Sequence, residues 1–201
     1  MELPAALVFA FFFVTGSAEK TTVTWTFFVL WEAHYINRSL IYPLRTRTDG
    51  KRIPVLIVAM AILFNVGNGF VNGQYLGVIA PVYEIAWFTD PRFLIGALLF
   101  VSGAVINLRS DSTLLRLRSE SGSGYQIPRG GLFDRVSCPN YLGEIIEWIG
   151  FAVATWSPAA LVFAIWTAAN LIPRALSHHS WYKSTFSEYP SDRKAVIPGL
   201  F

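Results

Sequence analysis

Six long runs of apolar residues follow one another along the chain, separated by segments rich in polar residues, glycine and proline. A membrane-spanning helix needs roughly 20 mostly apolar residues, and the runs approach that length. Only Ser157 and Pro158 separate the last two runs, which predicts a tight turn within a helical hairpin. We therefore predict an all-α, polytopic transmembrane helical bundle, formed by residues 1–201 as a single membrane-embedded domain, with spans at about 1–16, 22–42, 53–77, 93–108, 140–156 and 158–173.

Lys and Arg are distributed unequally between the segments that connect these spans. If the spans alternate across the membrane, 43–52, 109–139 and 174–201 lie on one side and contain all of the 16 Lys and Arg except Lys20, Arg38 and Arg92. Cytoplasmic loops carry such an excess. We expect a multi-pass protein of the bacterial inner membrane or the endoplasmic reticulum, with this basic side in the cytoplasm. The longest of these segments, 109–139, is predicted to be a functional loop.

The composition agrees with lipid as the solvent for much of the surface. Hydrophobic residues make up 53% of the chain and charged residues 14%, whereas soluble domains carry about a quarter charged residues. A single cysteine, Cys138, excludes an intrachain disulfide and a multi-cysteine metal site, and three His make a metal centre unexpected. No basic run with interleaved aromatics suggests a nucleic-acid partner.

Polar residues occur within the predicted spans and share a depth near the basic side. In the second span, Trp31, Tyr35, Arg38 and Tyr42 recur at helical spacing and therefore lie on one face. Ionisable groups inside a membrane usually mark a site or a pathway. The sequence thus predicts one buried polar cavity open toward the cytoplasm, to which five spans contribute Glu2, His34, Tyr35, Arg38, Asn65, Asn68, Asn72, Asn107, Asp111, Asn140, Glu144 and Glu147.

Each of these groups also has an interpretation that needs no site. Gly67, Gly69 and Gly73, which lie among the asparagines, have the small-residue spacing of helix packing. Arg38 and Asp111 can extend to the membrane interface. The two glutamates near the start of the fifth span are favoured there by the helix dipole. The shared depth, rather than any single residue, favours the cavity.

No sequence motif of a known cofactor fold accompanies these residues. The chain has no G-x-G-x-x-G after a strand, no P-loop and no G-x-S-x-G elbow. A dinucleotide would need Arg and backbone donors for its phosphates, and Asn, Asp and Glu for its amide and ribose. These residue types are present, but they suit other anionic cofactors too. Composition and spacing therefore lead to a membrane-embedded enzyme with a cytoplasm-facing polar site, and no further.

Long stretches of the chain resemble one known family. The stretch at 130–157 is similar to the signature of the steroid 5-alpha-reductases, or 3-oxo-5-alpha-steroid 4-dehydrogenases, and reads GGLFDRVSCPNYLGEIIEWIGFAVATWS. Four further stretches fit the same family in order: residues 34–44, 67–76, 107–118 and 173–198. Members have seven spans, and the first four residues of this chain resemble the start of their second span. We therefore expect that the chain lacks the family's first span.

The resemblance implies reduction of the C4–C5 double bond of a 3-oxo-Δ4 steroid by NADPH, in a bundle whose cytoplasmic loops close over the cofactor. Glu2 and Tyr35 match the pair that hydrogen-bonds the 3-oxo group, so that C5 of the polarised enone accepts a hydride. Glu2 could donate only when protonated, which burial would favour. A steroid or other lipid enone and membrane lipid are the implied partners. The implied cofactor-binding residues are Arg38, Asn107, Asp111, Arg118, Tyr125, Asn140, Glu144, Arg174, His178 and Tyr182, of which Arg118 and Arg174 would contact the phosphates.

Some features leave alternatives open. Gln126 stands where the family commonly has Arg, and the loop 45–52 departs from the family pattern. A trans-2-enoyl-CoA reductase of very-long-chain fatty acid elongation shares the stretch 137–141, although 144–148 and the glycine-rich 67–69 are more similar to the steroid enzymes. A membrane methyltransferase of the isoprenylcysteine type and a non-enzymatic lipid-binding protein are further alternatives, and the converging polar groups argue against the last.

Overall fold

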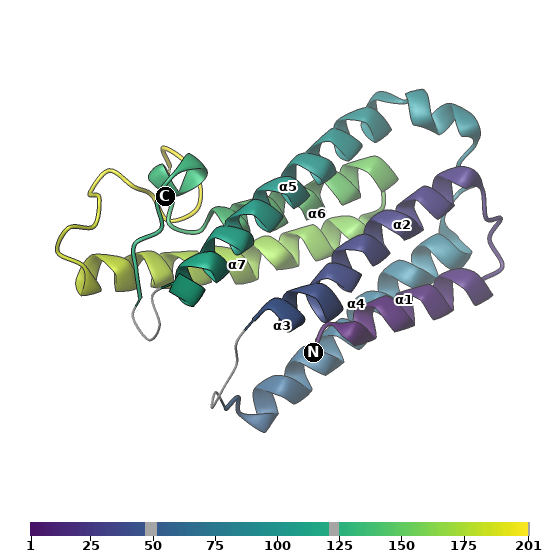
Figure 1. Cartoon of the computed structure of the whole chain (residues 1–201). Coiled ribbons are helices and arrows are strands. Elements are labelled where there is room, and N and C mark those ends of the chain that lie inside the picture. The colour runs from purple at the N-terminus through teal and green to yellow at the C-terminus, as the bar shows by residue number, and fades with distance from the viewer. Residues whose placement is uncertain (47–51, 121–124, 201) are drawn as a thin grey trace. The chain divides into compact units, whose positions relative to one another are not determined.

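The computed structural model describes residues 1–46, 52–120 and 125–200, without the side chain of residue 120, and is built from helices (Figure 1). No β-strand occurs among these residues, although two extended segments pair at one bridge, between Val136 and Lys194. Long helices lie at the positions of the six predicted spans: Leu3–Thr15 (α1), Thr22–Ile36 (α2), Val55–Gln74 (α4), Pro91–Glu120 (α5), Pro139–Thr155 (α6) and Pro158–Thr185 (α7).

Local sequence explains where several helices begin and how two of them end. Thr21 caps α2 by accepting a hydrogen bond from Thr24 N at 3.3 Å, and Ser157 Oγ accepts from Ala160 N at 3.2 Å at the start of α7. α2 and α4 each continue into a π-helical turn, Asn37–Ile41 (η1) and Tyr75–Ile79 (η2), and the short helix Tyr42–Arg45 (α3) follows η1. Because π-helical turns often occur at functional sites, the C-terminal ends of α2 and α4 are candidate positions for one.

Short 3₁₀ turns complete the described elements. They are Ile85–Thr89 (η3), before α5, and Gly131–Asp134 (η4), before α6. Gly130 and Gly131, at the start of η4, have φ values of 90° and 59°, a left-handed conformation that glycine adopts without a steric penalty.

Three stretches within the described residues are long and apolar enough to cross a membrane: Val55–Ile79, Pro91–Ser119 and Pro158–Thr185. Only 22%, 28% and 33% of their most apolar portions are buried within the protein, so many of their apolar side chains are left for lipid. α1 is also apolar but shorter. Among the described residues the all-helical class with three membrane-capable stretches is therefore confirmed, whereas six spans and their insertion in a membrane stay predictions.

The boundaries of two predicted segments were wrong. Residues 109–120 were expected to belong to a loop, but α5 continues through them to Glu120. The last span was expected to end near residue 173, but α7 continues to Thr185 with Pro173 inside it. An apolar run indicates which part of a helix can lie in lipid. The helix itself can continue into polar sequence, because its backbone hydrogen bonds do not depend on the side chains being apolar. Residues 121–124 of the predicted loop, and residues 47–51 of the loop at 45–52, lie outside the described residues.

The chain divides into two compact units, of which the first comprises Met1–Ile95 and Phe151–Ala160. Its core is aromatic: the rings of Phe9 and Trp31 stack with centroids 4.5 Å apart, and the Phe151 ring lies 5.6 Å from Trp31. All three side chains are buried. Burial of a side chain such as Phe stabilises a fold by roughly 1.5–3 kcal/mol relative to exposure. α1, α2 and the segment 151–160 therefore share one core.

Glycines of α4 bring this helix against the backbone of α1. A Cβ atom on Gly69 would lie 2.8 Å from Ala5 O, and one on Gly73 would lie 2.8 Å from Phe9 O. Gly67 has open space around its Cα. Close helix packing, which the sequence left as an alternative, thus explains two of these three glycines.

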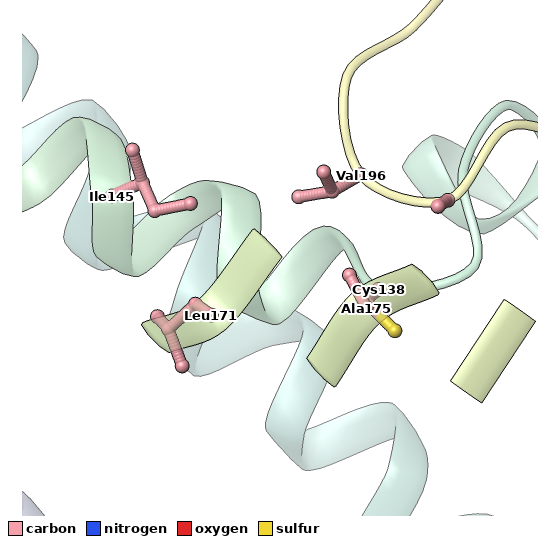
Figure 2. Close-up of a cluster of buried hydrophobic side chains, with 6 residues drawn as sticks. Cys138, Ile145, Leu171, Ala175 and Val196 are labelled. Carbon is pink, nitrogen blue, oxygen red and sulfur yellow. The ribbon is translucent and has the colours of Figure 1, made fainter. Parts of the chain in front are cut away.

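The second compact unit comprises Gly96–Gly150 and Leu161–Phe201. Within it α5 and α6 approach closely through glycines on both helices, since a Cβ on Gly143 would lie 2.5 Å from Asn107 N. A hydrophobic cluster joins α6, α7 and the C-terminal segment (Figure 2), and its buried members are Cys138, Ile145, Leu171, Ala175, Ala195 and Val196. The prediction of a single reductase domain is not decided by this division.

Candidate active site

A hydrogen-bonded chain of polar side chains holds Tyr35 in the first unit. Asn68 Nδ2 donates to the Tyr35 hydroxyl oxygen at 2.9 Å, and Asn72 Nδ2 donates to Asn68 Oδ1 at 3.0 Å. All three residues are buried, with exposed fractions of 3%, 8% and 2% for Tyr35, Asn68 and Asn72. A phenol that accepts one hydrogen bond can still donate its own proton to another group. Sequence analysis expected Tyr35 to donate to a substrate carbonyl, and this role stays a prediction.

Glu2 and Arg38 form an ion pair in the same unit. Arg38 Nε donates to Glu2 Oε2 at 3.3 Å, and both side chains are partly exposed. The guanidinium also lies over the Tyr42 ring, 5.2 Å from its centroid, a cation–π geometry. Glu2 is therefore a hydrogen-bond acceptor toward Arg38, so a donated bond from Glu2 to a substrate would need a proton on its other oxygen. Arg38, expected beside a cofactor, contacts Glu2, one member of the predicted catalytic pair.

A second polar network links α5 and α6 in the other unit. Asn107 Nδ2 donates to Asn140 O at 3.0 Å, and Asn140 Nδ2 donates to Asp111 Oδ1 at 3.1 Å. Asn107 and Asp111 are 3% and 4% exposed. The glycines at the α5–α6 contact allow these hydrogen bonds to form, because a side chain at Gly143 would collide with the backbone of Asn107. Three predicted cofactor residues are thus joined directly.

Basic groups of α5 and α7 form another part of the predicted cofactor set. Arg118 and Arg174 lie close enough to His178 to interact with it electrostatically, and both arginines are exposed. Tyr141 OH lies 3.4 Å from His178 Nε2. Two guanidinium groups close to one imidazole suit an anion such as a phosphate.

The remaining predicted residues lie at the edges of this set. The Tyr182 ring stacks on Tyr189 at 5.2 Å, with planes 13° apart. Tyr125 is exposed and its ring contacts Trp181 at 5.0 Å. Glu144 is half-buried on α6, one helical turn after Asn140. Among the described residues no group of three His, Cys, Asp or Glu side chains could hold a metal ion.

The structure therefore gathers the predicted residues into two sets. Glu2, Tyr35 and Arg38 belong to the first unit, and the remaining residues, from Asn107 to Tyr182, belong to the second. Convergence of both sets on one cavity stays a prediction. Sequence analysis placed Asn68 and Asn72 in the predicted polar cavity but gave them no catalytic or binding role, and their i, i+4 spacing on one helix was the available signal.

The family model and the similar known proteins all belong to one family. Residues 51–201 match the family model described as 3-oxo-5-alpha-steroid 4-dehydrogenase. The chain is 49% identical over 171 residues to "Steroid 5-alpha-reductase DET2" of Solanum lycopersicum, covering 84% of this chain and 66% of the relative. It is 49% identical over 168 residues to "3-oxo-5-alpha-steroid 4-dehydrogenase 1" of Homo sapiens, covering 84% of this chain and 64% of the relative.

A third relative aligns over the whole chain. This is "Steroid 5-alpha-reductase DET2" of Gossypium hirsutum, which is 41% identical over 208 residues, covering 100% of this chain and 80% of the relative. The chain thus spans slightly less than two thirds of the first two relatives and more of the third.

Proposed function

Because the chain belongs to the 3-oxo-5-alpha-steroid 4-dehydrogenase family, we propose that it reduces the C4–C5 double bond of 3-oxo-Δ4 steroids with NADPH. The observation that carries this proposal is the hydrogen bond from Asn68 Nδ2 to the Tyr35 hydroxyl at 2.9 Å, which holds a buried phenol that can still donate its own proton. The same family membership favours a lipid enone substrate delivered from the membrane. The oxidoreductase acts on a CH–CH bond.

Tyr35 is the proposed donor to the 3-oxo group. Its O–H hydrogen-bonds the carbonyl oxygen, draws electrons through the conjugated enone and makes C5 electrophilic. As the enone is reduced, negative charge develops on that oxygen, and a donor already aimed at it stabilises the transition state more than the ground state. Burial of Tyr35 strengthens this effect, because electrostatic interactions are larger where water is excluded.

Glu2 is the proposed second group at the 3-oxo position, and Arg38 holds it. The Arg38 Nε–Glu2 Oε2 bond of 3.3 Å fixes the carboxyl group from one side. The other carboxyl oxygen, when protonated, donates to the carbonyl. Arg38 is therefore proposed to position Glu2, in addition to its expected place near the cofactor.

The second unit holds the residues proposed to bind NADPH. When bound, the reduced nicotinamide would supply the hydride that C5 accepts, and a proton delivered to C4, from solvent or a side chain, would complete the reduction. Arg118, Arg174 and His178 suit the phosphates, because two guanidinium groups, one on α5 and one on α7, lie close to the His178 ring. The donors and acceptors of Asn107, Asp111 and Asn140 suit the amide and ribose. Glu144, Tyr125 and Tyr182 complete the set. We also propose that this set faces the cytoplasm.

The proposal is tested by turnover of the protein in detergent or membranes. NADPH is supplied with progesterone or testosterone, and in parallel with a trans-2-enoyl-CoA, and the products are identified by mass spectrometry. A 5-alpha-dihydrosteroid is expected. Reduction of the enoyl-CoA alone would assign the protein to the fatty-acid elongation alternative. Absence of turnover with every substrate would contradict the proposed reaction.

Variants then test the proposed donors separately. Tyr35→Phe is expected to lower kcat by about 100-fold or more, the loss typical of a removed oxyanion donor. Glu2→Gln tests the second group in the same assay. Tyr75→Phe is the matched control, since Tyr75 lies in η2 of the same unit and is not part of the predicted site. Wild-type turnover in Tyr35→Phe would remove Tyr35 from the mechanism.

A further inference from the structure

Ser137 lies where three segments of the second unit meet, outside the predicted cofactor set. Its Oγ is 2.7 Å from His179 Nδ1 on α7 and 2.6 Å from the Tyr189 hydroxyl oxygen. It also lies 3.1 Å from Lys194 O in the C-terminal segment. Ser137 is buried, with 4% of its surface exposed. One hydroxyl group thus connects the start of α6, α7 and the C-terminal segment.

Ser137 makes three polar contacts but has a single proton to donate, so its other partners must donate to it. Ser137 has one O–H to donate, and Lys194 O can only accept. At most one of the three contacts therefore uses the Ser137 proton, and the others require donation from Tyr189 or His179. Removing the hydroxyl would leave polar groups of both aromatic side chains without this partner. An unpaired buried polar group is costly, more so than the gain from a single hydrogen bond.

Main-chain hydrogen bonds reinforce the same junction. Ser137 N donates to Lys194 O at 2.8 Å, Cys138 N donates to Ala195 O at 3.0 Å, and Lys194 N donates to Arg135 O at 2.9 Å. Val136 and Lys194 pair as a parallel bridge. Ala195 and the neighbouring Val196 pack into the hydrophobic cluster of α6 and α7 (Figure 2). The C-terminal segment is thereby attached to α6 and α7 at once.

Arg193 extends the junction to the segment that follows Tyr125. Its side chain is 3% exposed, and its Nη1 donates to Pro128 O at 3.1 Å. Its guanidinium lies 4.9 Å from the centroid of the Tyr189 ring. A buried guanidinium held by a carbonyl and a ring face makes displacement of this segment costly.

Each segment that the junction fixes either carries a predicted cofactor residue or contacts one. His179 is adjacent to His178, Tyr189 stacks on Tyr182, and Cys138 stands two residues before Asn140. We propose that Ser137, His179, Tyr189 and Arg193 form a positioning clip that sets the cofactor-facing side chains of α6 and α7 for NADPH. The inference rests on the proposed function and adds residues to it that do not contact the reacting atoms.

The test measures NADPH binding and stability separately on the full chain in detergent. Isothermal titration with NADPH gives Kd, and thermal unfolding without cofactor gives Tm. Ser137→Ala is expected to raise Kd about tenfold, because two polar side chains beside cofactor residues lose their partner. Ser184→Ala is the matched control, since Ser184 is exposed on α7 and its Oγ bonds only its own helix, at Trp181 O. It is expected to bind NADPH as the wild type does.

Rescue distinguishes positioning from loss of structure. His179→Asn retains a hydrogen-bonding group at the place of Nδ1 and is expected to keep Kd within about threefold of wild type, while His179→Ala raises it like Ser137→Ala. If Ser137→Ala does not fold, Tyr189→Phe keeps the ring and removes only the hydroxyl, and a raised Kd is again expected. Equal Kd values for wild type and these variants would overturn the inference alone. A wild type that does not bind NADPH would overturn the proposed function with it.

Discussion

At the scale of single residues, the chemistry depends on which partner holds each polar group. Tyr35 accepts from Asn68, and Asn68 in turn accepts from Asn72, so two asparagines one helical turn apart determine the direction of the phenol. An asparagine side chain in an apolar helix is retained at a cost. The function proposed for the pair is to hold the Tyr35 hydroxyl, which apolar residues of the same volume could not do.

Replacing Asn68 should misorient Tyr35 without removing it. For Asn68→Leu we expect kcat/KM for the steroid to fall roughly tenfold, equivalent to about 1.4 kcal/mol of transition-state stabilisation. Steady-state kinetics with NADPH saturating measure the change. Asn170→Leu is the control, because Asn170 Nδ2 bonds only Trp166 O of its own helix. Equal losses in both variants would indicate a general effect of the substitution.

Cys138 gives a prediction about reactivity. The thiol is buried, with 5% of its surface exposed, and burial raises its pKa to about 12. Because the thiolate is the nucleophile and forms only as pH rises toward the raised pKa, the native protein at neutral pH should react with a maleimide at least about 100-fold more slowly than a free cysteine does. Labelling followed by mass spectrometry measures the rate, and denaturant should restore rapid reaction. Rapid labelling of the folded protein would show that the thiol is accessible.

At the scale of elements, close contacts between helices depend on glycine. On the α5–α6 contact, the atoms nearest to a Cβ at Gly143 are Asn107 N and Gly103 O, which are main-chain atoms and cannot rotate away. The same contact places Asn107 and Asn140 within hydrogen-bonding distance. The close packing of α5 on α6 and the hydrogen bond between Asn107 and Asn140 therefore depend on the same glycine contact.

A methyl group at this contact should therefore be costly. Gly143→Ala is expected to destabilise the protein by about 1–3 kcal/mol, the usual range for overpacking, and to weaken NADPH binding. Gly67→Ala makes the same change where a Cβ meets nothing within 4 Å, and should be neutral or stabilising by up to about 1 kcal/mol. Thermal unfolding in detergent compares the two. A smaller loss for Gly143→Ala than for Gly67→Ala would contradict the described contact.

At the scale of the whole molecule, apolar helices suited to lipid alternate with basic segments suited to water. In the described part of the chain, three helices are apolar enough to cross a membrane. Exposed basic residues of the predicted cytoplasmic segments include Arg118, Arg174 and Lys194. A membrane potential and anionic lipids favour Lys and Arg on the cytoplasmic side. The orientation in the membrane is therefore predicted from the distribution of Lys and Arg, and a labelling experiment can test it.

Single-cysteine reporters should reveal this orientation. Ser17 and Ser180 are both exposed, and the buried Cys138 is expected to remain unlabelled. In vesicles of known sidedness, a membrane-impermeant maleimide should label Ser180→Cys from the cytoplasmic face and Ser17→Cys from the opposite face. Labelling of both from one face would contradict the predicted alternation of spans.

The sequence alone located the helices and the residue types of the candidate site. Helices occur at all six apolar runs within the described residues, because a run of apolar side chains long enough for lipid must satisfy its own backbone hydrogen bonds. Tyr35, Asn107 and Asp111 were expected to be buried polar groups, and they are. Periodicity and composition are local properties, so they can be read directly from the chain.

Only the tertiary structure decided the partners and the ends of the helices. Asn68 and Tyr35 are 33 residues apart, Glu2 and Arg38 are 36 apart, and Ser137 and Tyr189 are 52 apart. No spacing rule links such positions, because their distance in space depends on how the helices pack. α5 and α7 likewise continue past their apolar runs, since a helix ends where its backbone loses hydrogen-bond partners and not where its hydrophobicity ends.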